Sequence, residues 1–138
     1  MRLMTRYIIV SLVAGVLFGV MDGIIYANPW AAELFEVYKP IAKTSVNAPA
    51  GIAIDLTYGL VMAGLFLLLY RGLPGRMGLH KGLSFALIAW FFRVLMSAAS
   101  AWMTLNIPPA TLVYSLVTGL GEMVILSLLF GLTLKPQT

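Results

Sequence analysis

The stretch that decides the fold is residues 81–135, KGLSFALIAWFFRVLMSAASAWMTLNIPPATLVYSLVTGLGEMVILSLLFGLTLK. Two apolar runs, each long enough to cross a bilayer, flank the short turn at 106–109. Arg93 lies 14 residues before Ile107, and Glu122 lies 15 residues after it. Because a helix rises about 1.5 Å per residue, an antiparallel hairpin places both charges at one depth, near the middle of the bilayer. The hairpin therefore predicts an intramembrane pair of opposite charges.

The composition extends this interpretation to the whole chain. Of 138 residues, 61% are hydrophobic and 10% are charged, whereas soluble domains are about 45–50% apolar and about 25% charged. We therefore expect an all-α protein, an integral membrane antiparallel four-helix bundle in one domain covering residues 1–138. The expected spans are approximately 7–27, 49–70, 82–104 and 109–134. Cysteine is absent and histidine occurs once, so we expect no metal site and no cofactor.

The longest connection, residues 29–43, separates the first and second spans. Trp30, Leu34 and Tyr38 recur at helical spacing, and Pro29 and Pro40 bound the pattern. Aromatic residues in such a segment are typical of the membrane interface. We expect a short amphipathic helix lying in that interface. An anchor that orients the bundle is the favoured role, and a lid over a cavity is the alternative.

The positive charges indicate an orientation. Six fall on one side of the expected membrane and two on the other, where Glu33 and Glu36 offset them. The six are Arg2, Arg6, Arg71, Arg76, Lys81 and Lys135, and the two are Lys39 and Lys43. By the positive-inside rule we expect a multi-pass protein of a bacterial-type inner (cytoplasmic) membrane, with both termini in the cytoplasm. The net charge of +4 then reflects topology, and no nucleic-acid partner is expected.

Each expected span carries one ionisable residue: Asp22, Asp55, Arg93 and Glu122. A charge at a helix centre costs about 2.5–3.5 kcal/mol on insertion scales, so such residues usually face the bundle interior and find partners. Asp22 and Asp55 are expected to share a level roughly 9 Å below the exterior boundary, one layer above the Arg93–Glu122 pair. These four residues comprise three acids and one base, which suggests that a proton, a cation or a partner's base completes the site.

Two further sets of residues stand out. Six hydroxyl groups could complete a polar network with these charges, and they belong to Tyr26, Tyr58, Tyr114, Ser97, Ser100 and Thr118. Gly15, Gly19 and Gly23 recur at four-residue spacing, a pattern that lets helix backbones approach closely in lipid. That smooth ridge indicates either tight packing inside the bundle or self-association.

These observations leave three functions open. The first is a non-enzymatic protein whose polar intramembrane site binds or passes a small solute, an ion, a proton or a lipid headgroup. The second is a structural or accessory subunit of a larger membrane complex or homo-oligomer, whose charges only pair helices. The third is a small intramembrane enzyme that uses Asp22 and Asp55. It is the weakest of the three, because the sequence contains no recognisable catalytic motif.

Overall fold

The computed structural model describes residues 2–41, 47–76 and 78–134, and within these ranges the chain forms helices and no strands. Four helical segments are long and apolar enough to cross a membrane: Leu3–Tyr26, Ala48–Gly72, Gly78–Thr104 and Pro109–Thr133, with mean hydropathy between 1.7 and 2.4. The predicted all-α four-helix membrane bundle is confirmed. The chain is a multi-pass membrane protein, since a helix satisfies its own backbone groups in lipid.

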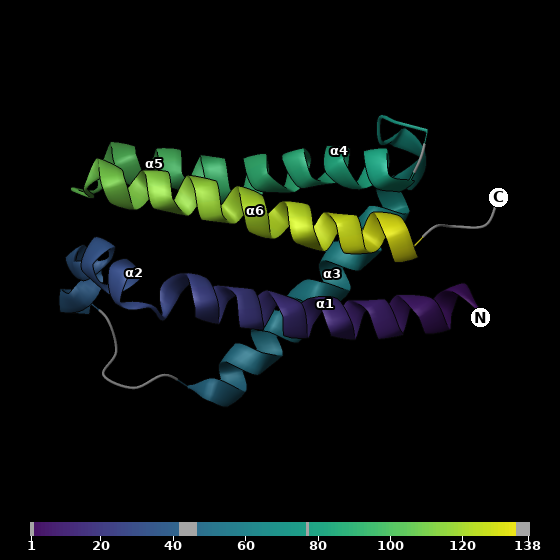
Figure 1. The fold of residues 1–138 in the computed structure, drawn as a ribbon, viewed down its shortest axis with the longest axis horizontal. Helices are drawn as coiled ribbons and strands as arrows, with labels where there is room; N and C mark the ends of the chain where they lie inside the picture. Colours follow the sequence, from purple (N-terminus) through teal and green to yellow (C-terminus); the bar gives the residue numbers. More distant parts are fainter. Residues whose placement is uncertain (1, 42–46, 77, 135–138) are drawn as a thin grey trace.

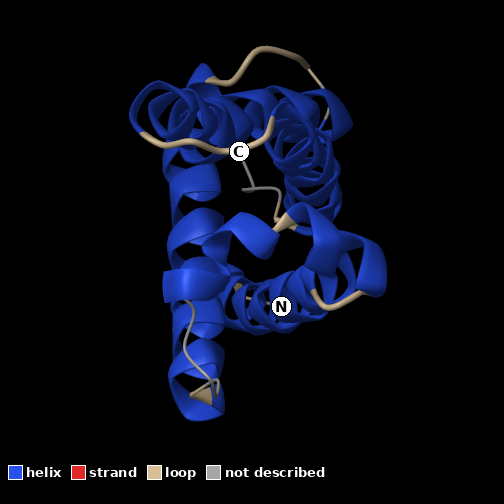
Figure 2. Ribbon diagram, turned by 90° about the vertical axis from the view of Figure 1, so that its left-hand side faces the viewer, coloured by secondary structure: helices blue, strands red, loops and turns tan. Residues whose placement is uncertain are grey.

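The four spans form two pairs. Helix α1 (Leu3–Tyr26) packs on α3 (Ala48–Leu69), α6 (Pro109–Thr133) packs on the third span, and α1 and α6 join the pairs. Figure 1 shows α1, α6 and the third span running side by side, while α3 crosses them obliquely. Figure 2 gives the same arrangement from the end of the bundle. We call the end that holds the chain termini the terminal end, and the opposite one the connection end.

Glycines set the contact between α1 and α3. A Cβ atom on Gly59 would lie 2.4 Å from the carbonyl oxygen of Ser11 and 2.7 Å from the amide nitrogen of Gly15. A Cβ on Gly15 would lie 2.9 Å from the Cα of Leu56. Backbone therefore touches backbone at this crossing. Of the expected ridge, Gly15 and Gly19 face α3, whereas a Cβ on Gly23 would meet nothing within 4 Å.

A second glycine contact joins the third span to α6, and sequence analysis had not singled it out. A Cβ on Gly131 would lie 2.2 Å from the carbonyl oxygen of Gly78 and 3.3 Å from the Cα of Gly82. Beside it, three buried aromatic rings form the core of the terminal end. They are Phe66, Phe85 and Phe130, with centroids 5.5 to 6.3 Å apart.

The third span is not the single continuous helix that was expected over residues 82–104. It consists of α4 (Gly78–Trp90), a π-helical turn η3 (Phe91–Leu95) and α5 (Met96–Thr104). The amide of Met96 donates to the carbonyl of Phe91, five residues back. A π-turn carries one extra residue, is rare and is found frequently at functional sites. Arg93 lies in its centre.

The connection after α1 also differs from the expected amphipathic helix. An α-helix, α2 (Pro29–Leu34), is followed by a 3₁₀-helix, η1 (Glu36–Ile41), and Pro40 lies inside the latter. The Asn28 side chain caps both sides of the bend, because its amide donates to the Ile25 carbonyl (2.8 Å) and its oxygen accepts from the Ala31 amide (2.8 Å). Residues 42–46, with Lys43, and residues 135–138, with Lys135, lie outside the described ranges.

Lys81, which sequence analysis counted among the charges at the membrane surface, is buried and caps the end of α3. The Lys81 ammonium donates to the carbonyl oxygens of Tyr70 (2.6 Å) and Leu73 (2.9 Å), and it lies 4.8 Å from the centre of the Tyr70 ring. These carbonyls follow the end of α3, where the helix leaves its last oxygens without partners. Lys81 therefore joins the start of the third span to the end of the second.

Candidate functional site

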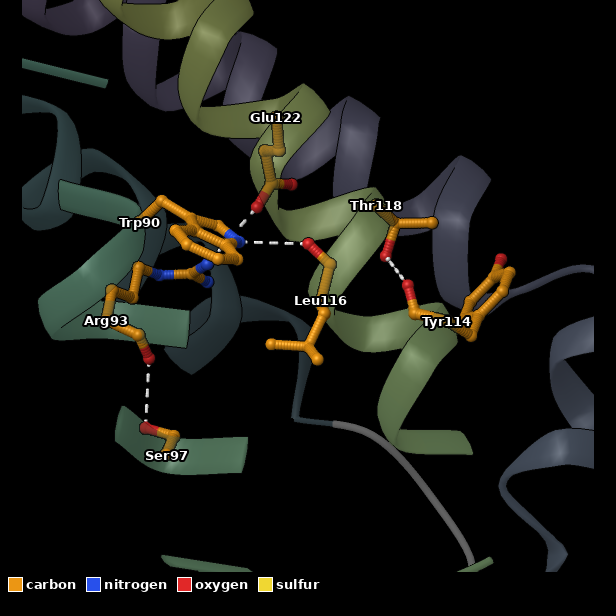
Figure 3. A network of polar contacts seen from close by, with 7 residues as sticks. All are labelled: Trp90, Arg93, Ser97, Tyr114, Leu116, Thr118 and Glu122. Atoms are coloured by element: carbon orange, nitrogen blue, oxygen red, sulfur yellow. Dashed lines mark hydrogen bonds and ion pairs between the residues drawn. The ribbon is translucent and has the colours of Figure 1, made fainter. Parts of the chain in front are cut away.

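Arg93 and Glu122 meet in the interior of the bundle. Arg93 Nη1 lies 3.4 Å from Glu122 Oε1, as the close view in Figure 3 shows. Their exposure differs: the Glu122 side chain is 2% exposed, and the Arg93 side chain is 34% exposed. The Glu122 carboxylate is thus sealed inside, while the Arg93 side chain remains partly exposed.

Two stacked aromatic rings contact the Arg93 guanidinium. Phe18 of α1 and Tyr58 of α3 stack with centroids 4.4 Å apart, and the guanidinium carbon of Arg93 lies 4.8 Å and 5.1 Å from the two centroids. A cation over an aromatic face is stabilised by the ring quadrupole, more strongly where water is excluded. Tyr58 therefore belongs to the support of Arg93, as does Phe18, which the sequence analysis did not single out.

The π-turn explains how Arg93 reaches this position. Arg93 and Val94 are consecutive, yet both contact α6: Arg93 pairs with Glu122, and the Val94 side chain lies against Gly119. The Ser97 hydroxyl donates to the Arg93 carbonyl (2.9 Å), which satisfies backbone that the widened turn disturbs. Next to the turn, Trp90 Nε1 donates to the Leu116 carbonyl of α6 (2.9 Å). Figure 3 shows both hydrogen bonds, from Ser97 to the Arg93 carbonyl and from Trp90 to the Leu116 carbonyl.

Asp22 lies beside Glu122, not in a separate layer above it. Met21 and Ile25, on either side of Asp22 in α1, line one pocket with Glu122, so the packing of α1 on α6 brings the two carboxyl groups together. In the described part of the chain, Asp22 Oδ1 and Glu122 Oε2 are buried and receive no hydrogen bond. Ionised carboxylates only accept hydrogen bonds, so these two oxygens can satisfy each other only through a proton.

The expected layering was wrong because the helices do not end at one level. Asp22 lies four residues before the end of α1, and Glu122 lies thirteen residues after the start of α6. By helical rise α6 therefore extends about 13 Å beyond α1 at the connection end. The segment after α1 fills that difference, since the Thr111 hydroxyl of α6 donates to the carbonyl of Leu34 at the end of α2, and the Tyr114 hydroxyl donates to the carbonyl of Ile25 at the end of α1. Tyr114 is thus a structural tie to the connection.

Asp55 is separated from the pair. Its carboxylate lies against Gly19, where a Cβ would approach Oδ2 to 2.7 Å. It lines a groove of about 440 Å³ between α1 and α3, together with the exposed side chains of Val16, Val20 and Ile52. Among the described residues, none forms an ion pair or hydrogen bond with Asp55. Asp22 is not part of the lining of this groove.

A separate cavity of about 290 Å³ leads to Arg93 from the connection end. Its polar lining consists of the Arg93 guanidinium and four hydroxyl side chains, from Tyr26, Tyr38, Ser97 and Ser115. Tyr38 comes from η1, so the connecting segment forms part of the cavity wall. Tyr38 and Ser115 were not among the expected site residues, because their approach to Arg93 depends on how η1 folds back and how α5 meets α6.

The arrangement thus combines a partly exposed Arg93 side chain, a set of hydroxyl side chains and a buried carboxyl pair. Comparison with protein-family models, with curated proteins and with solved structures found no match for this chain.

Proposed function

We propose that this membrane protein binds a small anionic group, a carboxylate or phosphate carried by a solute or by a lipid headgroup, in the cavity above Arg93. The observation that carries the proposal is that the Arg93 side chain is 34% exposed and lines an intramembrane cavity. A charge kept accessible at this depth costs several kcal/mol. A purely structural pair would gain from sealing both partners, and here only Glu122 is sealed.

The chemistry of the lining favours an anion. A guanidinium has five N–H donors in a rigid fork, and the contact with Glu122 uses one Arg93 nitrogen. The hydroxyls of Tyr26, Tyr38 and Ser115 add further donors around the same space. Carboxylate and phosphate groups match this fork geometry. At about 290 Å³ the cavity is at the small end of the range for ligand sites.

The direction of access follows from the charge distribution. Arg2, Arg6, Arg71 and Arg76 cluster around the terminal end, which the positive-inside rule assigns to the cytoplasm. The cavity extends from Arg93 towards Tyr38 and Leu112 at the other end, so we place its entrance at the exterior or in the outer leaflet. In a bacterial-type inner membrane this side is the periplasm.

Thermal unfolding of the purified protein in nanodiscs tests the binding. One arm titrates free methanesulfonate and inorganic phosphate, and the other compares phosphatidylcholine discs with discs that contain phosphatidylglycerol. A free anion at 100 times its Kd should stabilise the folded protein by about 2.7 kcal/mol. Stabilisation in the first arm identifies a solute, and stabilisation in the second alone identifies a lipid headgroup.

Two neighbouring alanines provide a matched pair of variants. Ala98 lines the cavity, and Ala99 is exposed on the outside of the same helix. Ala98→Leu should fill the cavity and abolish the stabilisation by anions, whereas Ala99→Leu should retain it. If neither arm stabilises the wild type, or if both variants respond alike, the proposal is wrong.

The groove with Asp55 favours a second function, as a subunit of a larger membrane complex or homo-oligomer. A carboxylate that no described residue pairs, set against Gly19, suits a partner helix with a donor or base at that depth. Because the chain has no cysteine, Val20→Cys is a single label for cross-linking in the native membrane. A cross-linked partner that disappears in the added Asp55→Leu variant supports this function, and a monomer alone contradicts it.

A further inference from the structure

The carboxyl pair behind Arg93 holds more negative charge than its surroundings balance. Glu122 is 2% exposed and accepts from Arg93 with Oε1 only, while its Oε2 and Asp22 Oδ1 are buried without a donor. Two adjacent carboxylates in a site of low dielectric disfavour joint ionisation. One proton between them supplies the missing hydrogen bond and removes one charge. Arg93 with the singly protonated pair is then neutral.

We infer that Asp22 and Glu122 share one proton and so form an intramembrane proton-binding site directly behind the anion cavity. Asp22 comes from α1 and Glu122 from α6, so the proton also joins the two helix pairs. The site lies outside the cavity lining, of which neither residue is a part.

The charged and titratable groups that face the pair come from each neighbouring element. Tyr26 lies on α1, Tyr58 lies on α3 and Arg93 lies on η3. Asp55, also on α3, lies apart from the pair in the groove against Gly19. In the described ranges Arg93 is the one base among them. A tyrosine side chain is neutral at neutral pH, so the balance concerns Arg93 and the carboxyl groups alone.

This charge balance couples anion binding in the cavity to protonation of the Asp22–Glu122 pair, and the coupling rests on the proposed function. A monoanion in the cavity attracts the Arg93 guanidinium away from Glu122. Arg93 and the anion then neutralise each other, which leaves the singly protonated pair with one uncompensated negative charge. Uptake of a second proton makes both carboxyl groups neutral. One anion therefore binds with one proton.

Infrared spectroscopy of the ligand-free protein in nanodiscs tests the shared proton. A protonated carboxyl has a carbonyl stretch that is separate from carboxylate bands and shifts in deuterium oxide. The wild type should show this band at neutral pH. Asp22→Asn should lose it, because the Asn amide donates to an ionised Glu122, and the matched control Asp55→Asn should keep it. A wild type without the band, or a band lost only in Asp55→Asn, overturns the inference.

The coupling is tested by the pH dependence of methanesulfonate binding, since the charge of this monoanion does not change near neutral pH. Uptake of one proton per anion makes the Kd rise about tenfold for each unit of pH. The Asp55→Asn control should keep that slope, and the double variant Asp22→Asn/Glu122→Gln should bind with a slope near zero. A wild-type slope near zero overturns the coupling. If methanesulfonate does not bind at all, the proposed function and the coupling fall together, while the infrared band still decides the shared proton.

Discussion

The crossing of α1 and α3 makes a prediction that can be worked through in detail. Gly59→Ala would place a methyl group 2.4 Å from the Ser11 carbonyl oxygen and 2.9 Å from the Gly15 Cα. The first distance is about 1 Å inside normal contact. Both atoms belong to the backbone of α1, so no side-chain rotation relieves the contact. The two helices must separate, and the loss extends along their whole interface.

The magnitude follows from comparison with an open site. Overpacking of a well-packed interior costs about 1–3 kcal/mol, and contact with backbone on the opposite helix favours the upper end of that range. Replacing Gly by Ala in a helix also gains about 1 kcal/mol from propensity. Gly121→Ala has that gain alone, because a Cβ there meets nothing within 4 Å. The two variants should therefore differ by about 3 kcal/mol, roughly a hundredfold in the unfolding equilibrium constant.

The measurement is equilibrium unfolding by sodium dodecyl sulfate in mixed micelles, followed by tryptophan fluorescence. Gly59→Ala should unfold at a lower detergent fraction than the wild type, and Gly121→Ala should unfold at the same or a higher fraction. If the two variants agree within about 0.5 kcal/mol, the range of ordinary surface substitutions, then backbone contact does not determine the α1–α3 interface and the reasoning fails.

Four further outcomes are expected, three in the same unfolding assay and the fourth, for Arg93, in that assay together with the anion titration in nanodiscs. Lys81→Met leaves two carbonyls without a charged donor and should cost about 1.5–3 kcal/mol, whereas Met at the exposed Arg71 should be near neutral. Trp90→Phe loses one hydrogen bond to α6 and should cost about 1 kcal/mol. Asn28→Ala removes the cap of α2 and should cost about 0.5–2 kcal/mol, and equal stability would contradict its role at the bend. Arg93→Met should abolish binding of anions yet leave a folded protein, since protonation of the neighbouring acids offsets the lost base; a protein that unfolds would favour a purely structural pair.

The sequence anticipated the membrane character and much of the charge placement. Hydropathy adds up locally along the chain, and lipid permits little besides helices for the spans that it predicts. The short turn at 106–109 then made the depths of Arg93 and Glu122 comparable, because both are counted from the same point. The same reasoning failed for Asp22 because it assumed that two different connections reach one boundary. The folded segment after Asn28 offsets α1 from α6 and moves Asp22 next to Glu122.

By itself, then, the sequence determined that the chain crosses a membrane four times and carries ionisable groups inside it. Only the tertiary structure decided which of these groups meet. The π-turn that directs Arg93 towards α6, the cap made by Lys81 and the cavity wall made by Tyr38 all depend on contacts between distant segments. Such contacts depend on backbone geometry and on the relative offset of helices, and neither leaves a periodic pattern in the residues. Asp55 illustrates the difference: its position in a span was evident, but only the oblique crossing of α3 placed it in an outer groove.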